Sequence, residues 1–302
     1  MKRIKKATAC IAMITAIMSA VLSTGCDEKK EGSMAADVLE PTEQTTEKVV
    51  DEWPDIEAFS PEPCGMLGRA KALRAINDDV VGYIKIKGTY VDYPVLQCED
   101  NEYYMDTDIY GNYLDSGSIF MDYRDNFDPD ESKQSQQIVL YGHNMLNGTK
   151  FASLHQYRED DSFYEESPII EFNSNYVENK YIIFAYFPTS GSYGESNYGE
   201  EFAYWDMENM DEKEFNEFMK TVKERSYISP DIEVKYGDQI LTLQTCWMDE
   251  DNSRFIVIGR KLRDDETPED FMKKIKNSEE PKNNDEQEGE DNSSEDAEDT
   301  ED

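Results

Sequence analysis

Short runs rich in β-branched and aromatic residues dominate the middle of the chain. Each has Gly, Asp, Asn or Pro at its ends or within a few residues of them, which is typical of strands. The runs cover residues 80–86, 91–95, 118–121, 137–141, 181–187, 239–245 and 255–262. Seven or more short strands at close spacing predict an antiparallel sandwich or a closed β-barrel.

Two segments have the period of an amphipathic helix instead. The run 66–76 can lead into the first predicted strand, and the run 212–225 places aromatic and apolar residues at helical spacing. Asp211 is the expected N-cap of the second helix, and Glu214, three residues later, completes a capping box. A further short helix is expected near residues 150–157.

Charge divides the chain into parts. The 302 residues carry 30 Lys and Arg against 67 Asp and Glu, a net charge of −37. Residues 27–65 and 264–302 contribute much of this excess and lack apolar periodicity over most of their length. We therefore expect an acidic flexible tether over 27–65, one folded domain over 66–263 and an acidic disordered tail over 264–302. Nucleic acid is not an expected partner, because its binding needs a basic surface.

The N-terminal segment, residues 1–26, has the order of an export signal. Four basic residues precede an uncharged run that ends at Cys26. Residues 22–26 (LSTGC) are similar to a bacterial lipobox, in which Cys26 would carry lipid, although Ser23 stands where a large aliphatic residue is usual. The run is also long enough to be an uncleaved membrane anchor. Both alternatives predict attachment through the N-terminus, on the outer face of the cell membrane.

Few residues offer nucleophilic or proton-transfer chemistry. The cysteines are Cys10, Cys26, Cys64, Cys98 and Cys246. The first two fall in the export segment, so an odd number remains, and an odd count outside the cell suggests a free thiol. A bridge between Cys64 and Cys98 would leave Cys246 alone, but spacing cannot establish that pairing.

Three reactive side chains stand at predicted strand ends. Cys246 closes one strand, Arg254 opens the next after a polar loop, and His143 follows the strand 137–141. A thiol, an imidazole and a guanidinium are the nucleophile, proton carrier and anion stabiliser that covalent acyl transfer needs.

Several segments, in order over about 190 residues, resemble a class B sortase. They are NDDVVGYIKIKGTYVDYPVLQ (77–97), DNEYYMDTDIYG (100–111), GSIFMDYR (117–124), IVLYGHNMLNGTKFASLHQY (138–157), GDQILTLQTCW (237–247) and RFIVIGRKL (254–262). The YGHNM and TLQTC…R motifs are the most specific of these. The resemblance implies a mainly β fold, a sortase-like closed barrel of seven to eight strands. An N-terminal helix and a long helix before the cysteine strand would complete it.

The resemblance also implies an activity, that of a membrane-anchored cysteine transpeptidase of a Gram-positive-type cell. Cys246 matches the nucleophile, His143 the general acid/base and Arg254 the residue that stabilises the oxyanion. The enzyme would cleave surface proteins after Thr in a C-terminal Asn-Pro-x-Thr-Asn/Gly sorting signal and form a thioester. It would then transfer the protein to a peptidoglycan precursor amine or, as a lesser alternative, to a pilin lysine.

Further residues match positions that contact substrate in the family. These are Asn101, Met105, Tyr141 and Thr245. The family often has Ser two residues before the cysteine, and this chain has Gln244 there, so a hydroxyl contact is not predicted at that position. Arg260 shares a strand with Arg254 and is interpreted as structural.

Other patterns favour structural roles. His155 is expected to be a structural or surface residue, and the aspartates between 122 and 130 are expected to form a solvated loop, since they lack the Gly and Glu of a calcium site. No zinc motif and no Gly-rich phosphate loop is present, so no metal and no cofactor is predicted. Two rival functions remain: a surface binding module without turnover, and a hydrolytic cysteine protease.

Overall fold

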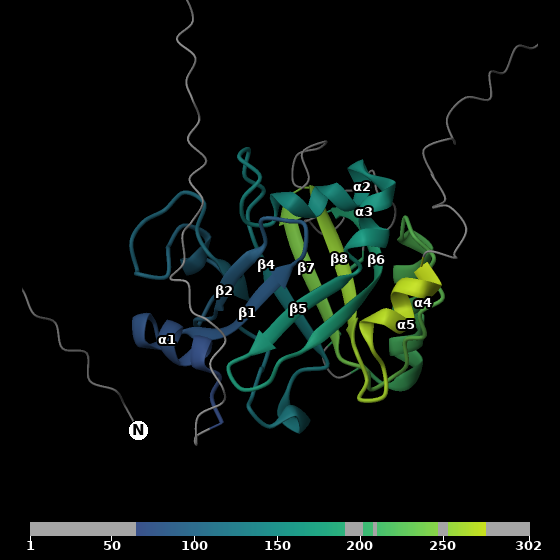
Figure 1. Cartoon of the computed structure of the whole chain (residues 1–302), viewed down its shortest axis with the longest axis horizontal. Coiled ribbons are helices and arrows are strands. Elements are labelled where there is room, and N and C mark those ends of the chain that lie inside the picture. The colour runs from purple at the N-terminus through teal and green to yellow at the C-terminus, as the bar shows by residue number, and fades with distance from the viewer. Residues whose placement is uncertain (1–64, 191–201, 208–209, 247–252, 276–302) are drawn as a thin grey trace, which may run out of the picture. The chain divides into compact units, whose positions relative to one another are not determined.

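The computed structural model describes residues 65–190, 202–207, 210–246 and 253–275 (Figure 1). The export segment over 1–26 lies outside these residues, and so does the predicted tether except for Gly65. Among the helices that the structure describes, none has the length and apolar character to cross a membrane.

Eight strands close into one barrel, which confirms the predicted fold class (Figure 1). They are β1 (Val80–Ile86), β2 (Asp92–Leu96), β3 (Ile119–Met121), β4 (Gln137–Tyr141), β5 (Ile169–Ser174), β6 (Lys180–Ser190), β7 (Ile240–Cys246) and β8 (Ser253–Lys261). Their order around the barrel is β1-β2-β3-β4-β7-β8-β6-β5.

Two of the strand pairs are parallel, β2 with β3 and β4 with β7. The other pairs are antiparallel. The hydrophobic period along one strand does not report the direction of its partner, so the sequence did not predict these parallel pairs. The parallel pair β4–β7 matters most, because it brings the carboxyl ends of two distant strands to the same end of the barrel.

Helices cover parts of the barrel. They are α1 (Gly68–Ile76), η1 (Tyr103–Met105), η2 (Glu131–Lys133), η3 (Ala152–His155), α2 (Gln156–Glu159), α3 (Asp161–Glu166), α4 (Glu212–Arg225) and α5 (Pro268–Ile275). The predicted capping box of α4 is confirmed: the Glu214 amide donates to the Asp211 carboxylate, and the Asp211 amide donates to the Glu214 carboxylate, both at 2.9 Å.

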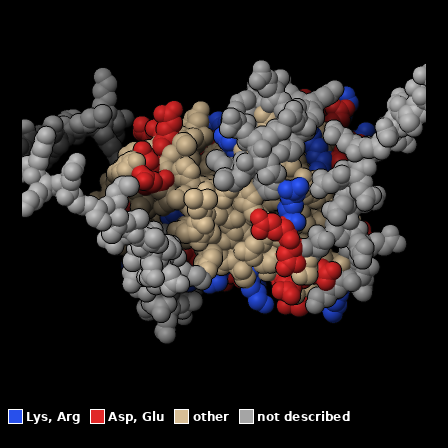
Figure 2. Space-filling view, turned by 90° about the horizontal axis from the view of Figure 1, so that it is seen from above, with Lys and Arg blue, Asp and Glu red and all other residues tan. Residues whose placement is uncertain are grey.

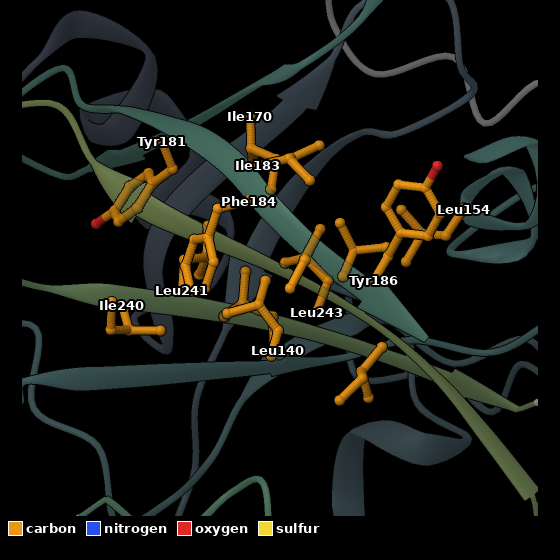
Figure 3. Packing of buried hydrophobic residues seen from close by; sticks show 14 of the residues in the cluster. Leu140, Leu154, Ile170, Tyr181, Ile183, Phe184, Tyr186, Ile240, Leu241 and Leu243 are labelled. Carbon is orange, nitrogen blue, oxygen red and sulfur yellow. The ribbon is translucent and has the colours of Figure 1, made fainter. Parts of the chain in front are cut away.

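Aliphatic and aromatic side chains fill the barrel (Figure 3). Leu140 of β4, Ile170 of β5, Ile183 of β6 and Leu243 of β7 are fully buried together. Each such side chain contributes about 1.5–3 kcal/mol when it leaves water. Residues that are neither acidic nor basic occupy the middle of the face seen in Figure 2, and the charged side chains gather beside them.

Strand β5 and helix α5 are among the elements that were not predicted. Strand β5 was missed because Glu171, Asn173 and Ser174 interrupt its apolar positions. Helix α5 lies within the predicted disordered tail, and that prediction is wrong for residues 264–275. Acidic composition obscured an amphipathic helix whose Phe271 and Ile275 are buried. Residues 276–302 lie outside the described part of the chain.

Candidate active site

The strands β4, β7 and β8 lie side by side and meet at one end of the barrel (Figure 1). In the parallel pair β4–β7, Tyr141 is opposite Gln244, and the Gly142 amide continues the pairing with a 3.1 Å hydrogen bond to the Gln244 carbonyl. His143 and Cys246 each follow two residues later, so the backbone register sets them level on neighbouring strand ends.

Arg254 lies on β8, the other neighbour of β7. In the antiparallel pair β7–β8, Cys246 is directly opposite Arg254. The side chain of Cys246 lies outside the described part of the structure, so its place follows from the backbone register alone. The row His143, Cys246, Arg254 therefore spans three adjacent strand ends.

The imidazole of His143 has a defined tautomer. Its Nε2 lies 2.7 Å from the backbone carbonyl oxygen of Met105. A carbonyl can only accept, so Nε2 carries the proton, and Nδ1 of the neutral ring is left as an acceptor. The backbone of His143 is held as well, because the Phe151 amide donates to its carbonyl at 3.0 Å. Nδ1 is thus the nitrogen able to exchange a proton with a bound molecule.

The guanidinium of Arg254 has no carboxylate partner within the described ranges. It is partly buried, and its Nη1 donates at 2.9 Å to the Ser253 carbonyl. The remaining N–H groups can therefore donate to an oxyanion that forms beside Cys246. A thiol, a proton carrier and an anion stabiliser in one row are suited to covalent acyl transfer.

A family model described as a sortase domain matches residues 84–262, more than half of the chain. This chain belongs to the sortase family. It is 32% identical over 195 residues to sortase B of Staphylococcus aureus, covering 64% of this chain and 74% of that protein. It is 30% identical over 190 residues to sortase B of Listeria monocytogenes, covering 62% and 72%.

The solved structures agree with the sequence comparison. A Staphylococcus aureus sortase B–substrate complex matches with a TM-score of 0.54 and 31% identity, covering 65% of this chain and 85% of that chain. The protein is thus a class B sortase, a cysteine transpeptidase.

Three of the predicted substrate contacts of this sortase lie near one another. The Tyr141 hydroxyl and the Asn101 amide both donate to one oxygen of Asp122, at 2.7 and 3.0 Å. Met105 is half exposed, and its carbonyl holds His143. Thr245 differs: its side chain is only 1% exposed, on the side of β7 that carries Leu243. The structure does not bring Thr245 together with the other three.

Gln244, where the family often has Ser, is held by the connection between β6 and β7. The Tyr204 hydroxyl donates to Gln244 Oε1. The backbone carbonyl of Tyr204 in turn accepts from Gln137 Nε2 at 2.7 Å. The segment 202–207 therefore contacts β4 and β7, and its Tyr204 hydroxyl reaches the residue two positions before Cys246.

Asp122 is the residue that sequence reasoning placed wrongly. It belongs to the aspartate-rich stretch predicted to be a solvated loop, yet it is only 1% exposed. Burial alone would raise the pKa of this carboxyl, but hydrogen bonds from Arg124 and other neighbours outweigh burial and hold the pKa below its ordinary value. Among the described residues, no three His, Cys, Asp or Glu side chains are grouped as metal ligands.

The remaining candidates have structural surroundings. His155 is buried, and its ring stacks on Phe255 with centroids 5.4 Å apart. Arg260 is fully buried and pairs with Glu266 at 2.6 and 2.9 Å, which agrees with the structural role predicted for it. Cys98 is a free thiol. Cys64 and the lipobox residue Cys26 lie outside the described residues.

Proposed function

We propose that this sortase cleaves proteins after Thr in a C-terminal sorting signal of the Asn-Pro-x-Thr-Asn/Gly kind and transfers them to a cell-wall amine. The observation that carries the proposal is the register of β4, β7 and β8, which supports a common site for His143, Cys246 and Arg254.

The reaction has two steps. The Cys246 thiolate attacks the Thr carbonyl carbon, and Arg254 donates hydrogen bonds to the oxyanion that forms. As the C–N bond breaks, protonated His143 gives its proton to the departing amine, which leaves a thioester. An incoming amine then attacks the thioester, neutral His143 accepts the proton of that amine, and the thiolate departs.

Substrate contacts are part of the same proposal. Asn101, Met105 and Tyr141 would line the groove for the signal peptide, and their grouping beside His143 supports this. The acceptor would be a peptidoglycan precursor amine, with a pilin lysine as the alternative. The solved relative described as a sortase B–substrate complex supports binding of a substrate by this kind of barrel.

The proposed location is the outer face of the cell membrane, with attachment through residues 1–26. The basic flank and the uncharged run of this segment support it. Intact mass of the membrane-extracted protein distinguishes a lipid on Cys26 from an uncleaved anchor. A protein that is released without either would contradict the proposed location.

A library of pentapeptide signals, incubated with the full chain and a short amine, tests the activity. The proposal predicts a ligated product that ends in Thr joined to the amine, and none with Cys246→Ala. Hydrolysed acid as the sole product would indicate a protease. Binding of the peptides without cleavage, together with a Cys246 that resists thiol-reactive probes, would indicate a binding module.

A further inference from the structure

The connection between β2 and β3 carries exposed aromatic side chains close to the candidate site. It extends to one side of the barrel, past β2 (Figure 1). Tyr103, Tyr110 and Tyr113, which we call the tyrosine surface, are 48%, 61% and 75% exposed. Met105 on the same connection is half exposed, and its carbonyl accepts from Nε2 of His143. Exposed aromatic side chains gathered on one segment indicate an interaction surface, whereas single ones need no explanation.

Hydrogen bonds fix the backbone beneath two of these tyrosines. The hairpin 107–113 is closed by a bridge between its two end residues. Within it, the Asp108 amide donates to the Asn112 carbonyl at 2.9 Å. The Asp108 carboxylate accepts from the amides of Tyr110 and Asn112, both at 2.8 Å. The hairpin therefore loses little conformational freedom when a partner binds to it.

Tyr103 reaches the same hairpin from η1. Its ring packs edge-on against the buried Tyr104, with centroids 4.9 Å apart. The Tyr104 hydroxyl donates to Asp79 Oδ2 at 2.8 Å and accepts from Asn77 Nδ2 at 3.1 Å. The Tyr103 hydroxyl lies 3.9 Å from the position that a Cβ would take on Gly111, at the turn of the hairpin. A buried anchor thus holds Tyr103 beside the hairpin that carries the other two tyrosines.

The charge of this connection favours a cationic partner. Residues 99–117 include six acidic residues and no Lys or Arg. Five of the six are exposed: Glu99, Asp100, Glu102, Asp106 and Asp115. The next basic residue along the chain, Arg124, is paired with Asp122 at 2.9 Å. Carboxylates attract a cation toward the surface, and the face of a tyrosine ring binds it through the ring quadrupole.

We propose that the tyrosine surface binds the acceptor of the transfer reaction as an ammonium ion, before the acceptor attacks the thioester. This rests on the proposed function, because it needs an amine acceptor. A primary amine is protonated at neutral pH, so rings and carboxylates near His143 raise its local concentration. The ammonium ion loses one proton to water, and the resulting amine attacks. The new C–N bond forms, neutral His143 takes a second proton from the nitrogen, and the C–S bond breaks to release the thiolate.

Two acceptors that differ in charge but not in shape test this. Propylamine is an ammonium ion at pH 7, and O-ethylhydroxylamine, of the same size, is uncharged there. The triple variant Tyr103→Leu, Tyr110→Leu, Tyr113→Leu keeps apolar side chains but removes the rings. In the full chain with a saturating signal peptide, we expect its kcat/KM for propylamine to fall about threefold to tenfold. The kcat/KM for O-ethylhydroxylamine should stay as in the wild type.

Tyr236→Leu is the matched control. Tyr236 is 47% exposed and lies beside α4, with its ring against Phe215. Its replacement should leave the rates with both acceptors unchanged. If the triple variant does not fold, Tyr113→Leu alone removes the most exposed ring. It should reduce kcat/KM for propylamine about twofold and leave the uncharged acceptor unaffected.

An equal fall with both acceptors would overturn the proposal, because the surface would then not distinguish charge. Unchanged rates with both acceptors in a folded variant would overturn it as well. A rise in the KM of the signal peptide alone would assign the surface to the donor and overturn its role in binding the acceptor.

A titration of the full chain with propylammonium chloride, followed by the ring signals of labelled tyrosine, tests the binding step without turnover. We expect shifts in signals that the triple variant lacks, and no such shifts would overturn the surface. Absence of ligated product with either acceptor in the wild type would contradict the proposed function instead, and the titration would still decide whether the surface binds an ammonium ion.

Discussion

Arg254 and Arg260 lie on the same strand, β8, six residues apart and on the same side of it. Arg260 is fully buried, forms a two-bond ion pair with Glu266 and packs over the Phe271 ring at 5.5 Å. Arg254 stands opposite Cys246 and, within the described ranges, donates only to its neighbour's carbonyl. One arginine is neutralised by a carboxylate, and the other has no carboxylate partner within the described ranges.

The difference shows how a barrel separates stability from chemistry. A paired, buried arginine connects β8 to the turn before α5, and nothing further can bind to it. The arginine at the opposite end of the strand has no carboxylate partner among the described residues, and its backbone lies opposite Cys246. Both residues are arginines on the same side of β8, so the presence or absence of a carboxylate partner within the described ranges is what distinguishes them.

The largest effect is expected for Arg260→Ala. It leaves Glu266 without its main partner and a cavity around Phe271, which should reduce the free energy of unfolding by about 3–5 kcal/mol. Denaturant melts measure this, and kcat per folded molecule at low temperature should match the wild type. Unchanged stability would show that the ion pair is not what distinguishes the two arginines.

Arg254→Ala should have the reverse profile. Loss of an oxyanion donor lowers kcat about a hundredfold to a thousandfold, which corresponds to about 2.7–4 kcal/mol in the transition state. Stability should change by less than about 0.5 kcal/mol, as for an ordinary partly exposed site. Arg254→Lys is the control: it keeps the charge but loses the planar donor fork, so an intermediate loss of rate is expected. A rate within threefold of wild type for Arg254→Ala would remove this residue from the mechanism.

Gly117→Ala tests the hydrogen bond between His143 and the Met105 carbonyl oxygen. Gly117 has φ +51°, and a Cβ there would clash with the Met105 carbonyl oxygen, so that carbonyl must move away. We expect about a tenfold fall in kcat and a loss of more than about 1 kcal/mol in stability. Gly237→Ala is the control, because it has φ +92° with nothing within 4 Å and should lose stability without losing rate.

The smallest effect concerns pH. Burial would raise the pKa of Glu266, but the hydrogen bonds from Arg260 and the Arg263 amide outweigh it, so the pKa lies below the ordinary value of 4.5. A depressed pKa contributes stability above about pH 4.5 that is lost as the pH falls through the folded-state value. The difference in melting temperature between wild type and Glu266→Gln should therefore shrink on acidification from pH 6 to pH 3. A constant difference would mean that the pair does not titrate as described.

Local patterns predicted most of the fold. Periodicity located the strands β1 and β4 and the capped helix α4, because these features depend on neighbours within a few residues. The parallel pairing of β4 with β7 joins residues about a hundred positions apart, and no local period encodes it. Helix α5 was not predicted for another reason. Acidic residues dominate the composition of the segment around it, whereas its burial depends on two apolar side chains.

The candidate reactive residues stood out in the sequence, and the residues that support them did not. Cys246, His143 and Arg254 stood out by residue type, by position at strand ends and by resemblance to a family motif. Asp122 looked like part of a solvated acidic loop, since two of its partners, the half-buried Asn101 and Tyr141, lie 21 and 19 residues away. A charge that is satisfied by distant donors cannot be distinguished from a solvated one by its sequence neighbours.

Mass spectrometry of the full chain, quenched during turnover of a signal peptide, detects the proposed thioester itself. We expect one adduct with the mass of the peptide up to Thr, bound to Cys246 through a thioester. It should disappear on addition of an amine and be absent from Cys246→Ala. Turnover by Cys246→Ala, or an adduct on another residue, would show that Cys246 is not the nucleophile.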